Sequence, residues 1–340
     1  MADVFSTNYM MGVLESLEKP SSFLLDRFFP FVQTETSEEI HFDVIDKTRR
    51  LAPFVSPVVA GKVQQQLGHT TKTFKPAYVK PKTPFDPSRP LKRAAGENIG
   101  GNLSPMQRIQ MAMVQTIADH RDQIFRRLEV MAGEALRTGK LTIAGEDYPT
   151  VELDFGRHAN NSVTLTTTAR WGEDGVSPLA DVETWAMGVL QRSGAKPTDV
   201  IMDVDAWKLF SADATVKERL DTRRVTNAVM QMGGPADVGG TYMGSIDGYN
   251  LFVYADWYID PADGQEKPVL PAHTVLLGGS RIEGVRAFGA IRDEEAGYQA
   301  MPIFVKSWVE KDPSVRYVLS QSAPLVVPTR INHTFRATVR

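Results

Sequence analysis

Apolar residues recur at every third or fourth position along one long stretch of the chain, which is the spacing of one face of an α-helix. The stretch follows Ser104 and Pro105, a cap residue and a first-turn proline, and stops at Gly139, a common helix terminator. This pattern predicts a helix over residues 105–138, about 51 Å long. Because this is about three times the usual helix length, we expect a spine shared between layers. Its apolar stripe comprises Met106, Ile109, Met113, Ile117, His120, Ile124, Leu128, Met131 and Ala135.

Residues 1–50 carry a shorter pattern of the same kind. Their helical stripe consists of Phe5, Tyr9, Val13 and Leu17. An apolar cluster follows, made of Phe23, Leu24, Phe28 and Phe29. We therefore expect a mainly helical N-terminal segment that packs on a core.

After Gly139 the apolar pattern alternates, as is typical of strands. Helical spacing returns between Asp181 and Gly194, and again in two short stretches that follow a buried strand beginning at Asp199. The glycine-rich residues 232–244 predict a loop. Further strands are expected at 140–145, 148–156, 162–171, 250–259, 273–279, 285–291, 303–310 and 315–327. The prediction is an α+β protein with a helix-bearing module, from about 180 to 280, inserted between strands.

Residues 51–93 differ from the rest of the chain in proline content and charge. They hold seven of the 21 prolines, and eight Lys or Arg residues against one acid, a net charge of +7. Prolines at this density exclude helices and central strands, although alternation over residues 67–80 permits an extended hairpin at a sheet edge. Few side chains of such a hairpin could cover a core of their own. We infer an arm that becomes ordered on another subunit.

Two kinds of partner suit this arm. DNA phosphates would bind the Lys and Arg residues of the arm, and the DNA bases would stack on Phe74, Tyr78 and Phe85. The prolines interrupt such a surface and the whole chain carries −3, so we favour protein–protein contact. The rest of the chain then carries −10, which makes the arm of one copy complementary to the body of another. The candidate inter-subunit contacts are Lys62, Lys72, Phe74, Lys75, Tyr78, Lys80, Lys82, Arg89, Lys92 and Arg93.

The chain of 340 residues contains no cysteine, which excludes disulfides, a thiol nucleophile and cysteine-based metal sites. Its hydrophobic content of 42% fits a globular protein. The first residues lack the basic and apolar regions of a signal peptide, and no run of about 18 apolar residues occurs. We expect a cytoplasmic protein without a membrane span.

Candidate chemistry is sparse. Asp199, Asp203 and Asp205 surround a strand end and could hold Mg²⁺ in a metal-dependent hydrolase, but Asp205 also fits as the N-cap of the next helix. The six histidines are scattered, and the glycines of residues 233–240 lack the Lys-Ser/Thr pair of a phosphate-binding loop. We expect no catalytic residue, metal or cofactor, and no enzymatic activity.

A series of motifs spans nearly the whole chain. In order they are SPVVAGKV (56–63), FKPAYVKPK (74–82), GKLTIAGEDYPTVELDFGR (139–157), DVDAWKLF (203–210), VKERLDTRR (216–224), LPAHTVLLG (270–278), GVRAFGAI (284–291) and QSAPLVVP (321–328). Together they resemble the lambda-like tailed bacteriophage major capsid proteins, the phage major capsid protein E family. FKPAYVKPK and VKERLDTRR make this resemblance specific.

The resemblance implies the tailed-phage/herpesvirus major capsid fold. It divides the chain into an N-terminal arm (1–50), an extended loop (51–95), a peripheral domain (96–179) with its spine helix (104–138), an axial domain (180–280) and a return to the peripheral domain (281–340).

The implied function is a non-enzymatic subunit of the icosahedral shell that encloses phage DNA, built from pentamers and hexamers. Such shells assemble in the host cytoplasm around a separate scaffold and a portal, and a decoration protein often joins the virion. Two alternatives stay open: a nucleic-acid-binding module at residues 62–93, and a cellular nanocompartment shell of the same fold.

Overall fold

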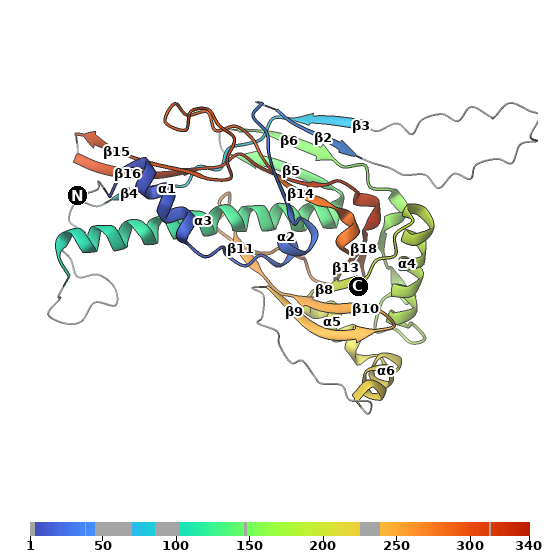
Figure 1. Ribbon diagram of the computed structural model, residues 1–340. Coiled ribbons are helices and arrows are strands. Elements are labelled where there is room, and N and C mark those ends of the chain that lie inside the picture. The colour runs from blue at the N-terminus through green and yellow to red at the C-terminus, as the bar shows by residue number, and fades with distance from the viewer. Residues whose placement is uncertain are drawn as a thin grey trace, which may run out of the picture.

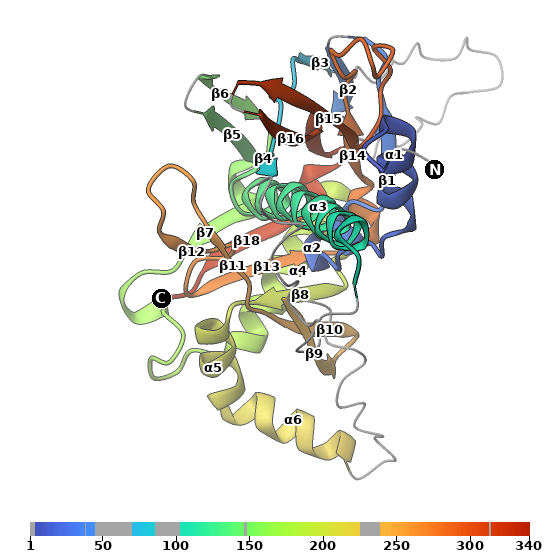
Figure 2. The same ribbon diagram turned by 90° about the vertical axis from the view of Figure 1, so that its left-hand side faces the viewer.

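The computed structural model describes residues 4–37, 39–44, 70–85, 103–145, 148–224, 239–312 and 314–340. One long helix crosses the molecule (Figures 1 and 2). Several small sheets lie on one side of this helix, and a module of strands and short helices lies on the other. The architecture is α+β, as predicted from the sequence.

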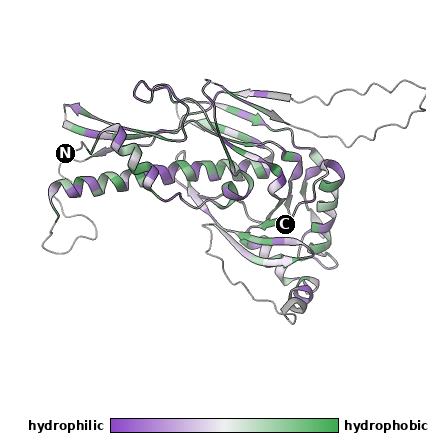
Figure 3. Ribbon diagram, viewed as in Figure 1, coloured by the Kyte–Doolittle hydropathy of each residue, from purple (hydrophilic) through white to green (hydrophobic). Residues whose placement is uncertain are grey.

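The long helix α3 (Pro105–Thr138) has the predicted bounds because local signals fix both ends. The Ser104 side chain accepts a hydrogen bond from Gln107 N, and the Gln107 side chain accepts one from Ser104 N, which forms a reciprocal cap. Gly139 ends the helix with a left-handed φ of 72°. Hydrophobic and hydrophilic residues alternate along the helix (Figure 3), so it packs on neighbours while one face stays accessible.

The two halves of α3 contribute to different apolar cores. Met113 and Ile117 pack in a core with Met10 and Leu14 of α1 (Thr7–Ser16). The residues predicted as the stripe of this first helix, such as Tyr9 and Val13, border that core and are only partly buried.

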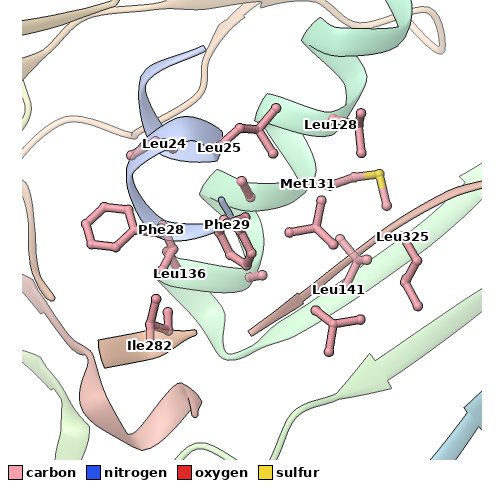
Figure 4. Packing of buried hydrophobic residues seen from close by; sticks show 14 of the residues in the cluster. Leu24, Leu25, Phe28, Phe29, Leu128, Met131, Leu136, Leu141, Ile282 and Leu325 are labelled. Carbon is pink, nitrogen blue, oxygen red and sulfur yellow. The ribbon is translucent and has the colours of Figure 1, made fainter. Parts of the chain in front are cut away.

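The C-terminal half of α3 packs in the main core against α2 (Phe23–Phe28) (Figure 4). The side chains of this contact are Leu24, Leu25, Phe28 and Phe29 on one side, and Leu128, Met131 and Leu136 on the other.

Four small sheets of the described residues lie on one side of α3. Two have three strands, in the orders β1-β14-β17 and β15-β16-β4, and two are the pairs β2-β3 and β5-β6. Their bounds are β1 (Phe31–Thr34), β2 (Ile40–Val44), β3 (Thr70–Phe74), β4 (Lys82–Phe85), β5 (Lys140–Gly145), β6 (Tyr148–Asp154), β14 (Gly284–Phe288), β15 (Phe304–Lys311), β16 (Ser314–Gln321) and β17 (Pro324–Pro328).

The module on the other side is built on a six-stranded sheet in the order β7-β18-β13-β8-β10-β9. The strands are β7 (Ser162–Thr164), β8 (Asp199–Met202), β9 (Gly240–Ile246), β10 (Tyr249–Tyr254), β13 (Thr274–Gly278) and β18 (Phe335–Thr338). The helices are α4 (Pro178–Ser193), α5 (Val204–Ala212) and α6 (Ala214–Arg224), and a hairpin of β11 (Trp257–Ile259) and β12 (Glu266–Pro268) projects beside α3. Among the described residues, short 3₁₀ turns occupy Ala159–Asn161, Thr167–Ala169, Ser280–Ile282 and Ile331–His333.

The structure corrects four local predictions. The helix expected to open at Asp181 begins at Pro178, whose fixed φ suits a first turn. Of the strand expected over 162–171, only Ser162–Thr164 pairs, because residues 167–169 form a 3₁₀ turn. The sheet of the 180–280 module also recruits β7 and β18, two strands from outside that range. Of the loop predicted at 232–244, residues 232–238 lie outside the described residues, whereas residues 240–244 belong to strand β9 instead of a loop.

Candidate assembly surfaces

The described part of the basic arm, residues 70–85, is joined to the body of its own subunit. β3 pairs with β2, and β4 pairs antiparallel with β16, with Thr83 opposite Val318. Phe74 is buried in the main core. The candidate contacts Lys62, Arg89, Lys92 and Arg93 lie outside the described residues.

Other candidate contacts from this segment also have partners within the subunit. Lys82 Nζ lies 3.9 Å from the ring centre of Tyr317 and 5.0 Å from that of Trp308, at cation–π distance. Lys80 Nζ lies 4.8 Å from the ring centre of Tyr78, whose hydroxyl donates to Ala290 O over 2.6 Å.

Two lysines at the start of the segment are placed differently. Lys72 donates to Asp154 O, whereas the side chain of Lys75 is exposed. The aromatic partners of Lys82 could not be predicted from the sequence, because β15 and β16 lie more than 200 residues further along the chain. The aromatic residues Trp308 and Tyr317 were the available signal, since they are directly opposed across that strand pair.

His120 connects the spine helix α3 to strand β4 of the basic segment 51–93. Its Nε2 lies 2.7 Å from Thr83 Oγ1 on β4, and its Nδ1 lies 3.0 Å from Ser320 Oγ on β16. Burial lowers the pKa of His120 against the opposing effect of Asp119, so the neutral ring is favoured. Strand β4 is therefore held to the spine by side-chain hydrogen bonds as well as to β16 by strand pairing.

Glu129 of α3 joins three parts of the fold at one buried carboxylate. Its Oε2 accepts from Leu25 N over 3.0 Å, and its Oε1 accepts from Leu24 N over 2.8 Å and from the Tyr254 hydroxyl over 2.9 Å. The two backbone donors are in the first turn of α2, where helix N–H groups lack internal partners. Burial raises the pKa of Glu129 to about 7 and outweighs these hydrogen bonds.

A second junction holds α2 to the six-stranded sheet. Arg27 donates two hydrogen bonds of 2.7 Å to Asp199, whose side chain is buried and also accepts from Asn250. Arg286 of β14 pairs with Asp26 and donates to Phe29 O over 2.7 Å. Sequence spacing gave no signal for these contacts, because their partners are far apart in the chain.

The three aspartates considered for Mg²⁺ have separate structural roles. Asp199 pairs with Arg27, and Asp205 pairs with Lys208 over 2.8 Å. Asp203, and not Asp205 as expected, is the N-cap of α5, because it is the carboxylate that accepts from Asp205 N and Ala206 N. Within the described ranges, no group of three or more His, Cys, Asp or Glu could hold a metal ion. Within the same ranges, no helix is long and apolar enough to cross a membrane.

Several exposed edges of the molecule are apolar. β1 is the edge of its sheet and all four of its residues are exposed, with Phe31 56% accessible. The outer strand β9 of the large sheet exposes Tyr242 and Met243, and the β11–β12 hairpin exposes Trp257 and Ile259. Monomeric proteins commonly protect such edges with charge or cover, so these surfaces are typical of a subunit that associates.

Solved structures place this architecture in the tailed-phage major capsid fold. A prophage protein of E. coli CFT073 described as a capsid protein superposes with a TM-score of 0.74 at 26% identity, over 98% of this chain and 99% of that one. The capsid of Ralstonia phage GP4 gives a TM-score of 0.54 at 12% identity, over 96% and 93% of the two chains. The class defined by the fold is therefore that of phage capsid shell subunits.

Sequence comparison gives the family. The family described as phage major capsid protein E matches residues 6–339. The major capsid protein of Escherichia phage lambda is 31% identical and that of Escherichia phage N15 is 32% identical, each over 95% of this chain and 96% of the relative. The chain belongs to the phage major capsid protein E family. The predicted family, fold and capsid function are confirmed.

Proposed function

We propose that this chain builds a closed phage head shell in which the basic segment 51–93 of one copy lies on the acidic body of the next. The observation that carries this proposal is the separation of charge, +7 in the segment against −10 in the rest of the chain. Strand β4 anchors that segment to the spine through His120 and pairs with β16, and strand β3 pairs with β2. These anchors would let one subunit transmit force to its neighbour.

Within this shell we assign residues 1–50 to an N-terminal arm, 51–95 to the extended loop, 96–179 and 281–340 to the peripheral domain, and 180–280 to the axial domain. The position of the six-stranded module on one side of α3 supports this division. The axial domain would lie at the centre of pentamers and hexamers. Because the sheet also uses β7 and β18, the axial and peripheral domains would be mechanically coupled.

We further propose that the shell assembles in the host cytoplasm with a separate scaffold, a portal and a decoration protein, and that it encloses DNA without sequence-specific binding. The exposed edges β1 and β9 offer surfaces for such partners and for further copies of the chain. The role is structural and non-enzymatic. The commitment of the carboxylates Glu129, Asp199 and Asp203 to hydrogen bonds within the fold supports this proposal.

A charge-reversal variant tests the inter-subunit contact. Lys62, Arg89, Lys92 and Arg93 would all be changed to Glu, which leaves every described contact in place. We expect a folded subunit, by circular dichroism, that forms no closed shells in electron microscopy, because like charges would then meet at the interface.

The matched control exchanges Lys and Arg at the same four positions and thereby keeps the charge. This control should assemble as the parent does. Normal shells from the charge-reversed variant would overturn the proposed contact.

A further inference from the structure

Three arginines converge at the C-terminal end of the spine. Arg137 is in the last turn of α3, Arg157 follows β6, and Arg336 lies on β18. Arg157 donates to Arg137 O over 3.1 Å and to Leu136 O over 2.5 Å, and it donates to Thr334 Oγ1 over 2.9 Å. Its guanidinium therefore ties the helix end to the chain that enters β18.

The charges of this arginine cluster (Arg137, Arg157 and Arg336) lack a counter-charge. In the part of the chain that the structure describes, no carboxylate lies within 4 Å of any of the three. Burial, and then the charge of Arg336, lower the pKa of Arg157 to about 9; burial, and then the charge of Arg137, lower the pKa of Arg336. The three side chains are half-buried, and charges withdrawn from water are ordinarily paired, so this arrangement calls for an anion.

Hydrogen-bond donors in the cluster are also unused. The Nε of each arginine is buried without an acceptor among the described residues. The same holds for Thr338 Oγ1, on the face of β18 that carries Arg336, opposite the buried Phe335. Arg336 makes one long hydrogen bond, of 3.4 Å, to Thr164.

There is room for a ligand beside Arg137. This residue lines a cavity of about 320 Å³ together with Glu134, Lys267 and Pro271. The volume is about ten times the roughly 30 Å³ of one liquid water. Glu134 accepts from Thr142 N, and Lys267 is paired with two aspartates, so the arginine is the positive group in this cavity that lacks an ion pair among the described residues.

We propose that the arginine cluster binds a phosphate group, either as free phosphate or as part of a DNA backbone. Guanidinium groups present forks of N–H donors that match phosphate oxygens. Donors that approach from α3, from the segment after β6 and from β18 suit a tetrahedral anion better than a planar carboxylate. A helix C-terminus by itself repels anions, and the bonds from Arg157 to the carbonyls of Leu136 and Arg137 offset that repulsion.

The test is a ³¹P NMR titration of inorganic phosphate with the full-length unassembled subunit at constant ionic strength. We expect saturable broadening of the phosphate signal, with at least tenfold weaker binding for Arg336→Gln and for Arg137→Gln. The exposed Arg170→Gln is the matched control and should bind as the parent does. Arg336→Lys is a further variant that keeps the charge. Circular dichroism of each variant shows whether a loss of phosphate binding reflects misfolding.

A second arm of the same titration identifies the source of the phosphate. A short DNA duplex that displaces inorganic phosphate from the parent, and binds Arg336→Gln less tightly, would assign the site to DNA. A duplex that leaves inorganic phosphate bound to the parent would assign the site to the free anion. Non-saturable broadening with the parent, or equal binding by Arg336→Gln, would overturn the proposal.

Discussion

Single polar side chains join segments that are far apart in the sequence. Glu129 on the spine accepts hydrogen bonds from α2 and from β10. Asp199 of β8 accepts hydrogen bonds from the guanidinium of Arg27 on α2. Each carboxylate is buried, so its hydrogen bonds act in a low dielectric and its loss would leave donors unpaired. Only the apolar neighbours of these residues could be predicted from the sequence, because periodicity shows which face is buried and not which polar group finds a partner there.

Glu129 makes stability depend on pH. Because its pKa is raised from 4.5 to about 7, the folded state binds a proton more tightly than the unfolded state does. The stability that this proton supplies is full below about pH 4.5 and is lost as the pH rises towards 7, by up to about 3 kcal/mol. We expect the unfolding free energy of Glu129→Gln to fall less steeply with rising pH than that of the parent. Urea denaturation of the unassembled subunit between pH 5 and 8 measures this slope.

The exposed Glu173→Gln serves as the control for that measurement, since it removes a carboxylate from the surface. It should keep the slope of the parent. Equal slopes for the parent and for Glu129→Gln would contradict the assignment.

The Arg27–Asp199 pair provides a second prediction at this scale. Arg27→Ala leaves the buried Asp199 without its cation, which we expect to cost about 3 kcal/mol of unfolding free energy. Lys208→Ala breaks the exposed pair with Asp205 and should cost no more than about 0.5 kcal/mol. Chemical denaturation measures both, and similar losses for the two variants would show that burial does not set the strength of this pair.

At the scale of elements, local signals and long-range pairing differ in what the sequence reveals. The bounds of α3 and the end of α4 at Gly194 could be predicted because caps and glycines are read within a few residues. The six-stranded sheet could not be predicted, because it pairs β7 with β18, whose partners Ser162 and Arg336 are 174 residues apart in the chain. The strand pairing of residues 70–85 was missed for the same reason.

The end of the spine gives a prediction about glycine. Gly139 has a φ of 72°, and a Cβ there would lie 2.6 Å from Arg157 Cβ. Gly156 has a φ of 75° with open space around it. Gly156→Ala should therefore cost about 1 kcal/mol for the left-handed backbone alone, and Gly139→Ala about 2 kcal/mol or more. Thermal unfolding of both variants measures the difference, and an equal drop in Tm would exclude the steric contribution.

At the scale of the whole molecule, the spine connects separate cores instead of enclosing one. One half of α3 packs with Met10 of α1, and the other half packs with Phe28 of α2. The apolar edges β1 and β9 remain available for neighbours. Composition alone gave a near-neutral chain, and the distribution of its charge along the sequence was the more informative property.

The absence of cysteine has a consequence at the same scale. A shell of this chain cannot be held by disulfides, so its strength would come from many packed and interlocked contacts acting together. Contacts between subunits were predicted from the charge and proline content of segment 51–93. The contacts of Phe74 and Lys82 within their own subunit could be found only in the structure.

Sedimentation velocity of the purified chain, with negative-stain electron microscopy of the fastest fraction, measures self-assembly itself. We expect megadalton particles that are closed and hollow. A chain that sediments only as a 37.7 kDa monomer, under conditions where circular dichroism shows it to be folded, would contradict self-assembly.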